Sequence, residues 1–345
     1  MKRLAWAVAA VVAVACVLAF WEIGDPYRGF EGEVFYELKR GTAGGAMARE
    51  LAELGVVRSR WHFLAARVLR PRAALQAGEY RFASAASARE VLDRIARGDT
   101  FHLDVTIPEG SNLFEIAELL ERGGFTTSAE FLRAARDPAA VKALAPEAET
   151  LEGYLFPSTY QVGRKVDAAV LCRRMVAEFE RVWKELGGGA EVHRTVTLAS
   201  LVEKETAVAA ERAAVASVYA NRLELGMRLD CDPTVIYAAL LEGKWRGTIY
   251  RSDLDREHPY NTYRVAGLPP GPIANPGEAS LKAALHPANT SYLYFVAAAD
   301  GSGGHVFSDS LRAHERAVGR YRQSQRKPER PARPRETKEK KKPCR

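Results

Sequence analysis

Short apolar runs separated by glycine turns predict an α+β fold for this chain. Residues 34–38 and 103–107 have the character of strands, and each run leads through a Gly-Thr or Gly-Ser turn into an amphipathic helix that ends at glycine. The two segments match at an offset of 69 residues, so they are either one β-turn-α unit used twice or two units with convergent spacing. The matched residues are Gly41, Thr42, Met47, Ala48, Leu51 and Gly55, which correspond to Gly110, Ser111, Ile116, Ala117, Leu120 and Gly124.

Further elements lie on both sides of the second unit. Asn112 and Glu115 have the spacing of a capping box, which predicts a helix start at this point. If the unit is a true repeat, it is of the LysM type, a small glycan-binding module. The other predicted elements are strands at 78–82, 293–297 (buried) and 305–307, and helices at 87–97, 168–186, 195–206 and 211–225.

The amino terminus has the pattern of a membrane segment. Residues 4–21 are eighteen residues without a charge, which as a helix measure about 27 Å against a hydrocarbon core of about 30 Å. A cleaved signal peptide is the alternative, but the apolar run continues to Trp21, a residue suited to the far membrane interface. We expect an uncleaved anchor in the cytoplasmic (inner) membrane, with Lys2 and Arg3 on the cytoplasmic side and the rest of the chain outside.

The net charge of +7 is concentrated at the carboxyl terminus. Residues 320–345 contain twelve basic and three acidic side chains, so residues 1–319 carry a net charge of −2. This distribution argues against a nucleic-acid partner for the folded part. We therefore predict four parts: a cytoplasmic stub and transmembrane anchor at 1–24, the repeated αβ region at 33–150, a mixed α/β catalytic domain at 151–319, and a disordered basic tail at 320–345.

Two glutamates on the helix predicted at 195–206 are the first candidates for chemistry. Glu205 follows Leu198, Leu201 and Val202 at helical spacing, so it extends the apolar stripe, whereas Glu203 points toward solvent. A carboxyl group on an apolar face has a raised pKa and is suited to general-acid catalysis of glycosidic cleavage. The alternative is that Glu205 simply ends the helix and turns to water or to an arginine.

Later motifs strengthen the catalytic interpretation. The stretch 267–277 contains four prolines and three glycines, which predicts a stiff loop of the kind that lines a sugar-binding cleft. Four motifs accompany it: Val-Glu-Lys-Glu-Thr at 202–206, Asp-Pro-Thr-Val at 232–235, Tyr-Asn-Thr-Tyr at 260–263 and Leu-Pro-Pro-Gly at 268–271. The four cysteines are scattered, and they indicate neither a disulfide framework nor a zinc site.

With these motifs, nearly the whole chain resembles the MltG (YceG-like) family of endolytic murein transglycosylases. The resemblance implies cleavage of the MurNAc–GlcNAc bond of nascent peptidoglycan strands to give 1,6-anhydroMurNAc ends, which would terminate strand elongation. It implies partners in glycan strands, membrane lipid and peptidoglycan synthases, and no metal or cofactor. Glu205 is the implied catalytic residue. The residues expected to bind substrate are Glu203, Asn221, Asp232, Thr234, Tyr260, Asn261, Tyr263 and Pro270.

One departure and two rival functions stay open. The family usually has Gln-Thr or Gln-Ser before Asp-Pro-Thr, where this chain has Asp230-Cys231, and we expect Cys231 to act as a small buried side chain. The first rival is a non-catalytic peptidoglycan-binding or scaffold protein. The second is a hydrolytic muramidase with Asp232 or Asp253 as its second carboxylate, although the sequence shows no obvious second carboxylate directed inward.

Overall fold

The computed structural model describes residue 6, residues 22–206 and residues 208–325. The predicted membrane anchor at 4–21 and the tail beyond residue 325 lie outside the described residues, apart from residue 6. Among the helices that are described, none is both long and apolar enough to cross a membrane.

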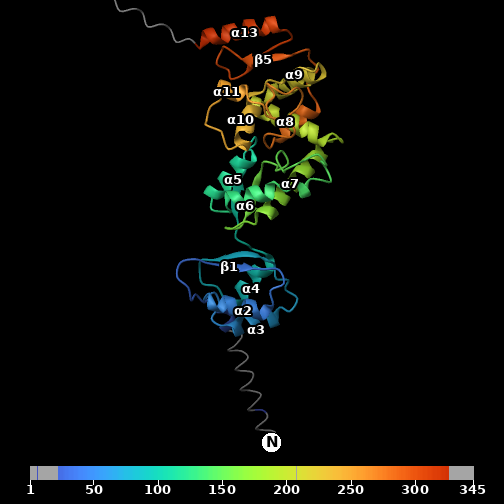
Figure 1. The fold of residues 1–345 in the computed structure, drawn as a ribbon. Coiled ribbons are helices and arrows are strands. Elements are labelled where there is room, and N and C mark those ends of the chain that lie inside the picture. The colour runs from blue at the N-terminus through green and yellow to red at the C-terminus, as the bar shows by residue number, and fades with distance from the viewer. Residues whose placement is uncertain (1–5, 7–21, 207, 326–345) are drawn as a thin grey trace, which may run out of the picture. The chain divides into compact units, whose positions relative to one another are not determined.

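The described chain folds into two compact units. In Figure 1 the colour follows the chain from blue near the N-terminus to red near the C-terminus. The first unit contains the residues up to Thr106, together with Leu120–Thr126 and Thr159–Asp167; the second contains Ile107–Leu119, Thr127–Ser158 and the chain from Ala168 onward. This division corrects the predicted boundary at 150/151, because residues 159–162 pair with residues 103–106 and residues 127–158 pack with the later helices.

The first unit contains a two-stranded antiparallel sheet covered by helices on one side (Figure 1). Strands β1 (Val34–Leu38) and β2 (Gly78–Phe82) form where the sequence predicted strands, and they pair in the register Val34↔Phe82. Each strand buries alternate residues, Tyr36 and Leu38 on β1 and Tyr80 and Phe82 on β2, against the helices. The helices are α2 (Gly44–Glu53), α3 (Arg60–Leu69) and α4 (Ala88–Arg97), the last with a complete Ser87–Glu90 capping box.

The two predicted β-turn-α segments share their backbone geometry. Gly41 and Gly55 flank α2, Gly110 and Gly124 flank α5 (Leu113–Arg122), and all four glycines have φ between 70° and 81°. Side chains other than glycine rarely adopt this left-handed conformation, so glycine recurs at these positions for a physical reason. In α5 the capping box also forms, because Asn112 Oδ1 accepts from the amide of Glu115 at 3.0 Å. The prediction of two similar units is confirmed locally, while a LysM fold stays a prediction.

The second unit is mainly helical. It contains most of α5 and then α6 (Ser128–Ala135). Its central helix is α8 (Val192–Glu205), which starts three residues earlier than predicted and packs against α9 (Arg212–Glu224) and α12 (Glu278–Leu285). The strand predicted as buried, β5 (Tyr294–Ala297), is half-buried and pairs with β6 (His305–Ser308). The remaining helices of this unit are η1 (Pro138–Ala140), α7 (Ala168–Glu185), η2 (Ala209–Glu211), α10 (Asp232–Leu241) and α11 (Arg251–Leu254). Strands β3 (Leu103–Thr106) and β4 (Thr159–Val162) pair with each other in an antiparallel sheet that belongs to the first unit.

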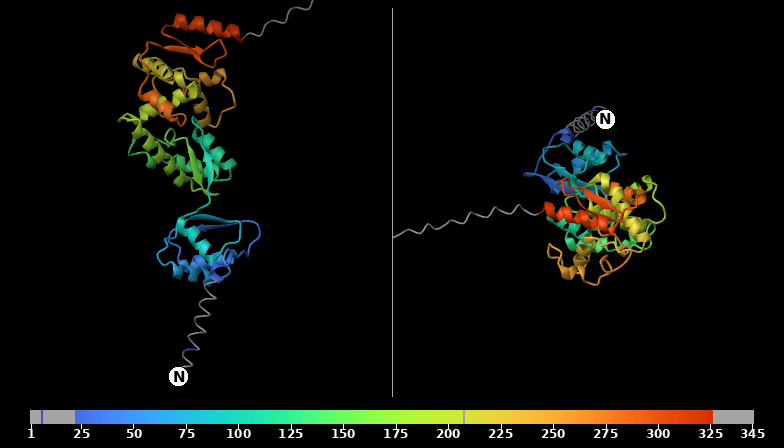
Figure 2. Two further views of the ribbon diagram at one scale, coloured as in Figure 1. Left: turned by 180° about the vertical axis from the view of Figure 1, so that it is seen from behind. Right: turned by 90° about the horizontal axis from the view of Figure 1, so that it is seen from above.

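Helix α13 (Leu311–Ser324) corrects the predicted start of the tail at residue 320. It packs across β5 and β6, as Figure 2 shows from behind, and buries Ala317. The basic residues Arg320 and Arg322 therefore belong to a folded helix. The high charge of this segment led to the prediction of disorder from residue 320. A helix that covers a small sheet needs apolar residues on one side only, so a highly charged segment can still form one.

The Pro-rich stretch 267–277 turns out to be largely core. Ile273, Ala274 and Asn275 are at most 2% exposed, and no residue of this loop lines the hollow that contains Glu205. Asn275 Nδ2 donates to Glu152 Oε1 at 2.9 Å, and the opposite oxygen of Glu152 accepts from the Leu113 amide at 3.0 Å and the Tyr237 hydroxyl at 2.9 Å. This buried carboxyl group therefore ties α5, α10 and the Pro-rich loop together.

Candidate active site

A polar cavity of about 400 Å³ in the second unit contains Glu205 in its wall. Six parts of the chain meet there: the end of α8, the second half of α9, the turn that leads into α10, the loop after α11, strand β5 and the start of α13. The lining residues are Glu205, Tyr219, Arg222, Leu229, Asp230, Asp232, Tyr263, Tyr294, Phe295, Leu311 and His314.

Glu205 occupies the position that the helical spacing predicted. Leu201 and Val202 are fully buried and Leu198 nearly so, and half-buried Glu205 continues their side of α8 into the cavity. Burial raises the pKa of Glu205, and the negative charge of Asp232 raises it further. The Tyr219 hydroxyl donates to Glu205 Oε1 at 3.0 Å, and the Cys231 thiol also hydrogen-bonds the carboxyl group; both oppose the rise. The result is a carboxyl group able to hold a proton nearer neutral pH than an exposed glutamate can.

Tyr219 and Cys231 are held rigidly beside this carboxyl group. Both are 1% exposed, and the Tyr219 ring meets the Phe295 ring edge-on with centroids 6.1 Å apart. Cys231 takes the expected role of a small buried side chain, and it follows Asp230, whose φ of 51° is unusual for a residue other than glycine. The sequence analysis missed Tyr219, although a tyrosine on the apolar side of a helix signals a buried hydroxyl that needs a partner.

Glu203 does not point toward solvent, so that prediction is wrong. Its side chain is 7% exposed, Oε2 accepts from the Gly277 amide at 3.0 Å, and Oε1 lies 3.7 Å from Arg212. It does not line the cavity. The helical spacing correctly predicted that the two glutamates lie on different sides of α8. It could not show that the loop before α12 covers the side on which Glu203 lies.

Two further carboxylates line the cavity, although both residues are exposed to solvent. Asp232 is the first residue of α10, and its Oδ1 accepts from the Tyr263 hydroxyl at 2.7 Å. Asp230 lies on the turn just before it. The structure therefore brings together three of the predicted site residues, Glu205, Asp232 and Tyr263.

The wall of the cavity also contains an arginine, a tyrosine and a histidine. The Arg222 guanidinium lies 5.1 Å from the centroid of the Tyr294 ring and donates to the carbonyls of Leu293 (2.7 Å) and Leu229 (3.0 Å). His314 of α13 stacks on Tyr294 with ring centroids 5.2 Å apart. Burial lowers the pKa of His314, so its imidazole is neutral at pH 7. The sequence analysis missed His314, although it shares helical spacing with Leu311.

Three predicted substrate-binding residues have side chains already occupied by the protein. Asn221 Nδ2 donates to the carbonyls of Thr290 and Tyr292, both at 2.9 Å, and fixes the approach to β5. Asn261 Nδ2 donates to three carbonyls around α11, and the fully buried Thr234 hydroxyl donates to the Cys231 carbonyl at 2.6 Å. These polar motif side chains therefore stabilise the backbone around them by hydrogen bonds to carbonyl groups.

Tyr260 and Pro270 also lie away from the cavity. The Tyr260 ring packs on Tyr237 with centroids 5.2 Å apart, and the Pro270 carbonyl is 2.8 Å from His193 Nε2. Pro270 borders a different hollow of about 610 Å³, formed by residues 257–270. That hollow is larger, but Glu205 is not among its lining residues.

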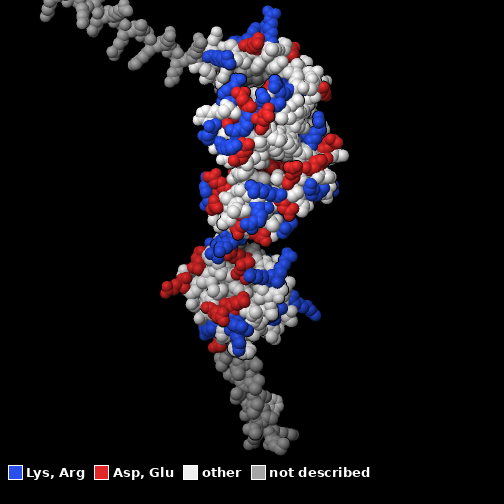
Figure 3. All heavy atoms as spheres, viewed as in Figure 1, with Lys and Arg blue, Asp and Glu red and all other residues white. Residues whose placement is uncertain are grey.

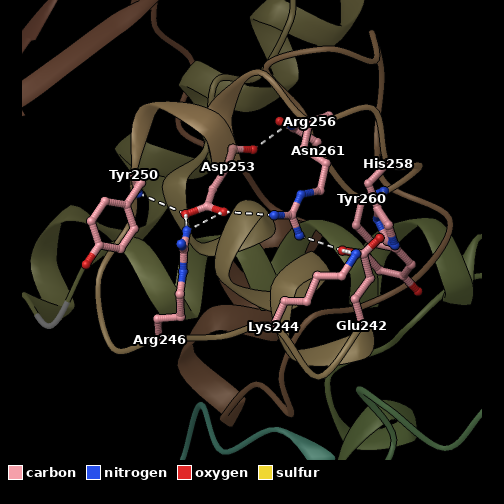
Figure 4. Close-up of polar contacts among 9 residues, drawn as sticks. All are labelled: Glu242, Lys244, Arg246, Tyr250, Asp253, Arg256, His258, Tyr260 and Asn261. Atoms are coloured by element: carbon pink, nitrogen blue, oxygen red, sulfur yellow. Dashed lines mark hydrogen bonds and ion pairs between the residues drawn. The ribbon is translucent and has the colours of Figure 1, made fainter.

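Asp253 is held in a separate ion-pair cluster around α11 (Figure 4). It accepts from the Tyr250 amide at 2.9 Å and pairs with Arg246 and Arg256, which together hold the pKa of this carboxyl group below its usual range. It does not line the cavity around Glu205. A carboxylate occupied in this way is a poor partner for Glu205, so of the two candidates for a second carboxylate, Asp232 is the one in position.

Replacing Tyr219 by Phe should shift the pH dependence of activity. The mutation removes a hydrogen bond that favours the carboxylate form of Glu205, so the pKa of Glu205 should rise and the alkaline limb of the rate profile should move up by about one pH unit. Tyr237→Phe is the matched control, because its hydroxyl bonds Glu152 instead, and it should leave the limb in place. An unshifted limb in Tyr219→Phe would refute this coupling.

Comparison with known proteins identifies the family of this chain. A family model described as the YceG-like family matches residues 36–320. An endolytic murein transglycosylase of Bacillus subtilis (strain 168) is 32% identical over 303 residues, covering 81% of this chain and 82% of that protein. A protein of the same name from Streptococcus pneumoniae serotype 2 (strain D39 / NCTC 7466) is 28% identical over 72% of this chain, which spans 51% of that longer protein.

A solved structure agrees with this result. The crystal structure of a putative yceG-like protein from Listeria monocytogenes is 31% identical and covers 83% of this chain and 99% of its own, with a TM-score of 0.52. The family model, the relatives and the solved structure all extend over both units of the fold. The chain belongs to the YceG-like family.

Proposed function

We propose that this protein is an endolytic murein transglycosylase, a lyase that cleaves peptidoglycan strands, with Glu205 as its catalytic residue. The observation that carries the proposal is the half-buried Glu205, with its raised pKa, in the wall of a polar cavity. The names of the Bacillus and Streptococcus relatives supply the reaction class.

In the proposed mechanism Glu205 serves first as an acid and then as a base. Its proton goes to the oxygen between N-acetylmuramate and N-acetylglucosamine as the bond to C1 breaks. The carboxylate then takes the proton of the muramate C6 hydroxyl, whose oxygen bonds to C1 and closes a 1,6-anhydro ring. The proton returns to Glu205, and no water is consumed. The Tyr219 hydroxyl stabilises the carboxylate between the two steps, because it donates to Oε1.

The cavity wall supports a sugar ligand. Tyr263, Tyr294 and Phe295 supply aromatic rings of the kind on which pyranose rings pack, and Asp232 supplies an acceptor for hydroxyl groups. We propose that Asp232 and Tyr263 contact the glycan, in line with their place in the motifs. Glu203, Asn221, Thr234, Tyr260, Asn261 and Pro270 would support the site from outside the cavity.

The setting of the enzyme is also part of the proposal. Residues 4–21 would anchor it in the cytoplasmic membrane with the described units outside, where it meets nascent strands and the synthases that make them. The first unit would bind glycan in the manner of a LysM module. We propose no nucleic-acid partner, because acidic and basic side chains are interspersed on the face that Figure 3 shows.

Product analysis separates this proposal from its rivals. Mass spectrometry of digested sacculi should show muropeptides with 1,6-anhydro ends, which are lighter by one water than the reducing ends of a muramidase. Asp232→Asn should change the rate but leave the ends anhydro, since Asp232 is not the nucleophile in a transglycosylase. Reducing ends would instead identify a muramidase with Asp232 as second carboxylate, and absence of any product would identify a scaffold.

A further inference from the structure

Helix α3 of the first unit exposes a stripe of large apolar side chains. Trp61 is 64% exposed, Val68 76% and Leu69 54%. Trp61 and Val68 are seven residues apart, two helical turns, so they lie on the same side of α3. The opposite side of α3 already packs inside the protein, because Phe63 and Ala66 are buried in the core of the unit. An outward apolar stripe of this kind on a helix that is already packed indicates a second contact surface.

The segment around this stripe is strongly basic. Between Glu53 and Glu79 the sequence contains five arginines, Arg58, Arg60, Arg67, Arg70 and Arg72, and no acidic residue. Arg60 lies over the Trp61 ring at 4.6 Å from its centroid, so cation and aromatic ring share the same surface. Arg70 is paired with Asp93 of α4, one guanidinium nitrogen of Arg67 is buried, and Glu22 lies 3.5 Å from His62. Arg58, Arg60 and Arg72 are exposed and keep this surface basic.

The chain enters the first unit beside α3. Glu22 Oε2 contacts His62 Nε2, and the next residue, Ile23, is 7% exposed and belongs to the core of the unit. The residues before Glu22 are the eighteen uncharged residues of the proposed membrane anchor. Glu22, where the described chain enters the unit, and α3 therefore share one side of the unit, while β1 lies on the other side (Figure 1).

We propose that α3 docks on the outer surface of the phospholipid bilayer. Trp61 and Val68 would enter the interfacial layer, and the exposed Arg58, Arg60 and Arg72 would bind the phosphate groups of anionic lipids. The contact would hold the first unit against the membrane at the point where the chain leaves it. This inference rests on the proposed anchor at residues 4–21, but not on the catalytic role of Glu205.

Lipid photocrosslinking with the full-length protein tests the docking. p-Benzoylphenylalanine is placed in turn at Trp61, at Val68 and, as a control, at Glu37, which is exposed on β1. Each protein is reconstituted in vesicles of phosphatidylglycerol and phosphatidylcholine, irradiated, and analysed by mass spectrometry for phospholipid adducts. We expect adducts at positions 61 and 68 in severalfold excess over position 37. We also expect a severalfold loss when phosphatidylcholine replaces the anionic lipid.

Two results would overturn the docking. Equal adduct yields at positions 61, 68 and 37 would show that α3 has no preferred contact with lipid. Crosslinks from positions 61 and 68 to a second copy of the chain would assign the stripe to self-association instead. Failure of the anchor is separately visible, because alkaline carbonate would then extract the wild-type protein from cell membranes.

Discussion

Replacing Glu205 by Gln should abolish the release of anhydro-muropeptides, with a loss in rate of about 1,000-fold or more. Glutamine keeps the size of the side chain and can still accept from the Tyr219 hydroxyl, so the fold should persist. It cannot donate an acidic proton to the glycosidic oxygen, nor accept the proton of the C6 hydroxyl. The measurement is quantitative mass spectrometry of products from purified sacculi at fixed enzyme concentration. Wild-type release by this variant would refute the assignment of Glu205.

Glu203→Gln is the matched control, because it makes the same chemical change two residues earlier on α8. Glu203 touches the Gly277 amide and Arg212 and does not line the cavity, so its loss should reduce activity far less and should act mainly through stability. Thermal unfolding of both variants shows which effect is structural. If Glu203→Gln were the inactive variant of the pair, the acid would have been assigned to the wrong side of the helix.

Replacing Glu152 by Gln should remove a pH dependence of stability. Burial raises the pKa of Glu152 from its ordinary 4.5 to about 8, even though the Leu113 amide and the Tyr237 hydroxyl favour the charged form. A folded-state pKa above the unfolded value means that the native state binds the proton more tightly. The contribution of Glu152 to the free energy of unfolding is therefore complete below pH 4.5 and is lost as the pH rises to about 8. The total loss over this range is about 5 kcal/mol at most.

Urea unfolding at pH 5 and pH 8 measures this effect. The free energy of unfolding of wild type should fall relative to that of Glu152→Gln as the pH rises, because the amide does not titrate. The variant should also lose about 1–3 kcal/mol at both pH values, since its NH2 group must face either the Asn275 amide or the Leu113 amide, both of which donate to the carboxyl group. Parallel pH profiles for the two proteins would contradict the raised pKa.

The elements that the sequence predicted well are those with a strong local signal. β1, β2 and α4 form where strand-like and helical patterns placed them, because alternation, a capping box and a terminal glycine act within one element. The turn glycines at 41, 55, 110 and 124 likewise all have a positive φ, which explains why glycine occupies these positions. Glu205 was identified from the phase of a single helix, which is also a local property.

The site residues that the sequence misassigned are those whose role depends on distant partners. Asn221 and Asn261 were expected to bind sugar, yet their amides hold carbonyls 69 and 7 residues away. Nothing in a motif distinguishes an amide that faces a ligand from one that holds a turn, because both need a small polar side chain. Asp253 shows the same difficulty, since its arginine partners become apparent only in the folded chain.

The sequence by itself determined the family, most of the elements and the glutamate that faces inward, because helical periodicity and dense motifs are written along the chain. Tertiary structure decided what surrounds that glutamate. Tyr219, Arg222, Asp232 and His314 come from three helices up to 109 residues away, and packing brings them to one cavity. The pKa of Glu205 depends on that burial and those neighbours, and so does its fitness as an acid.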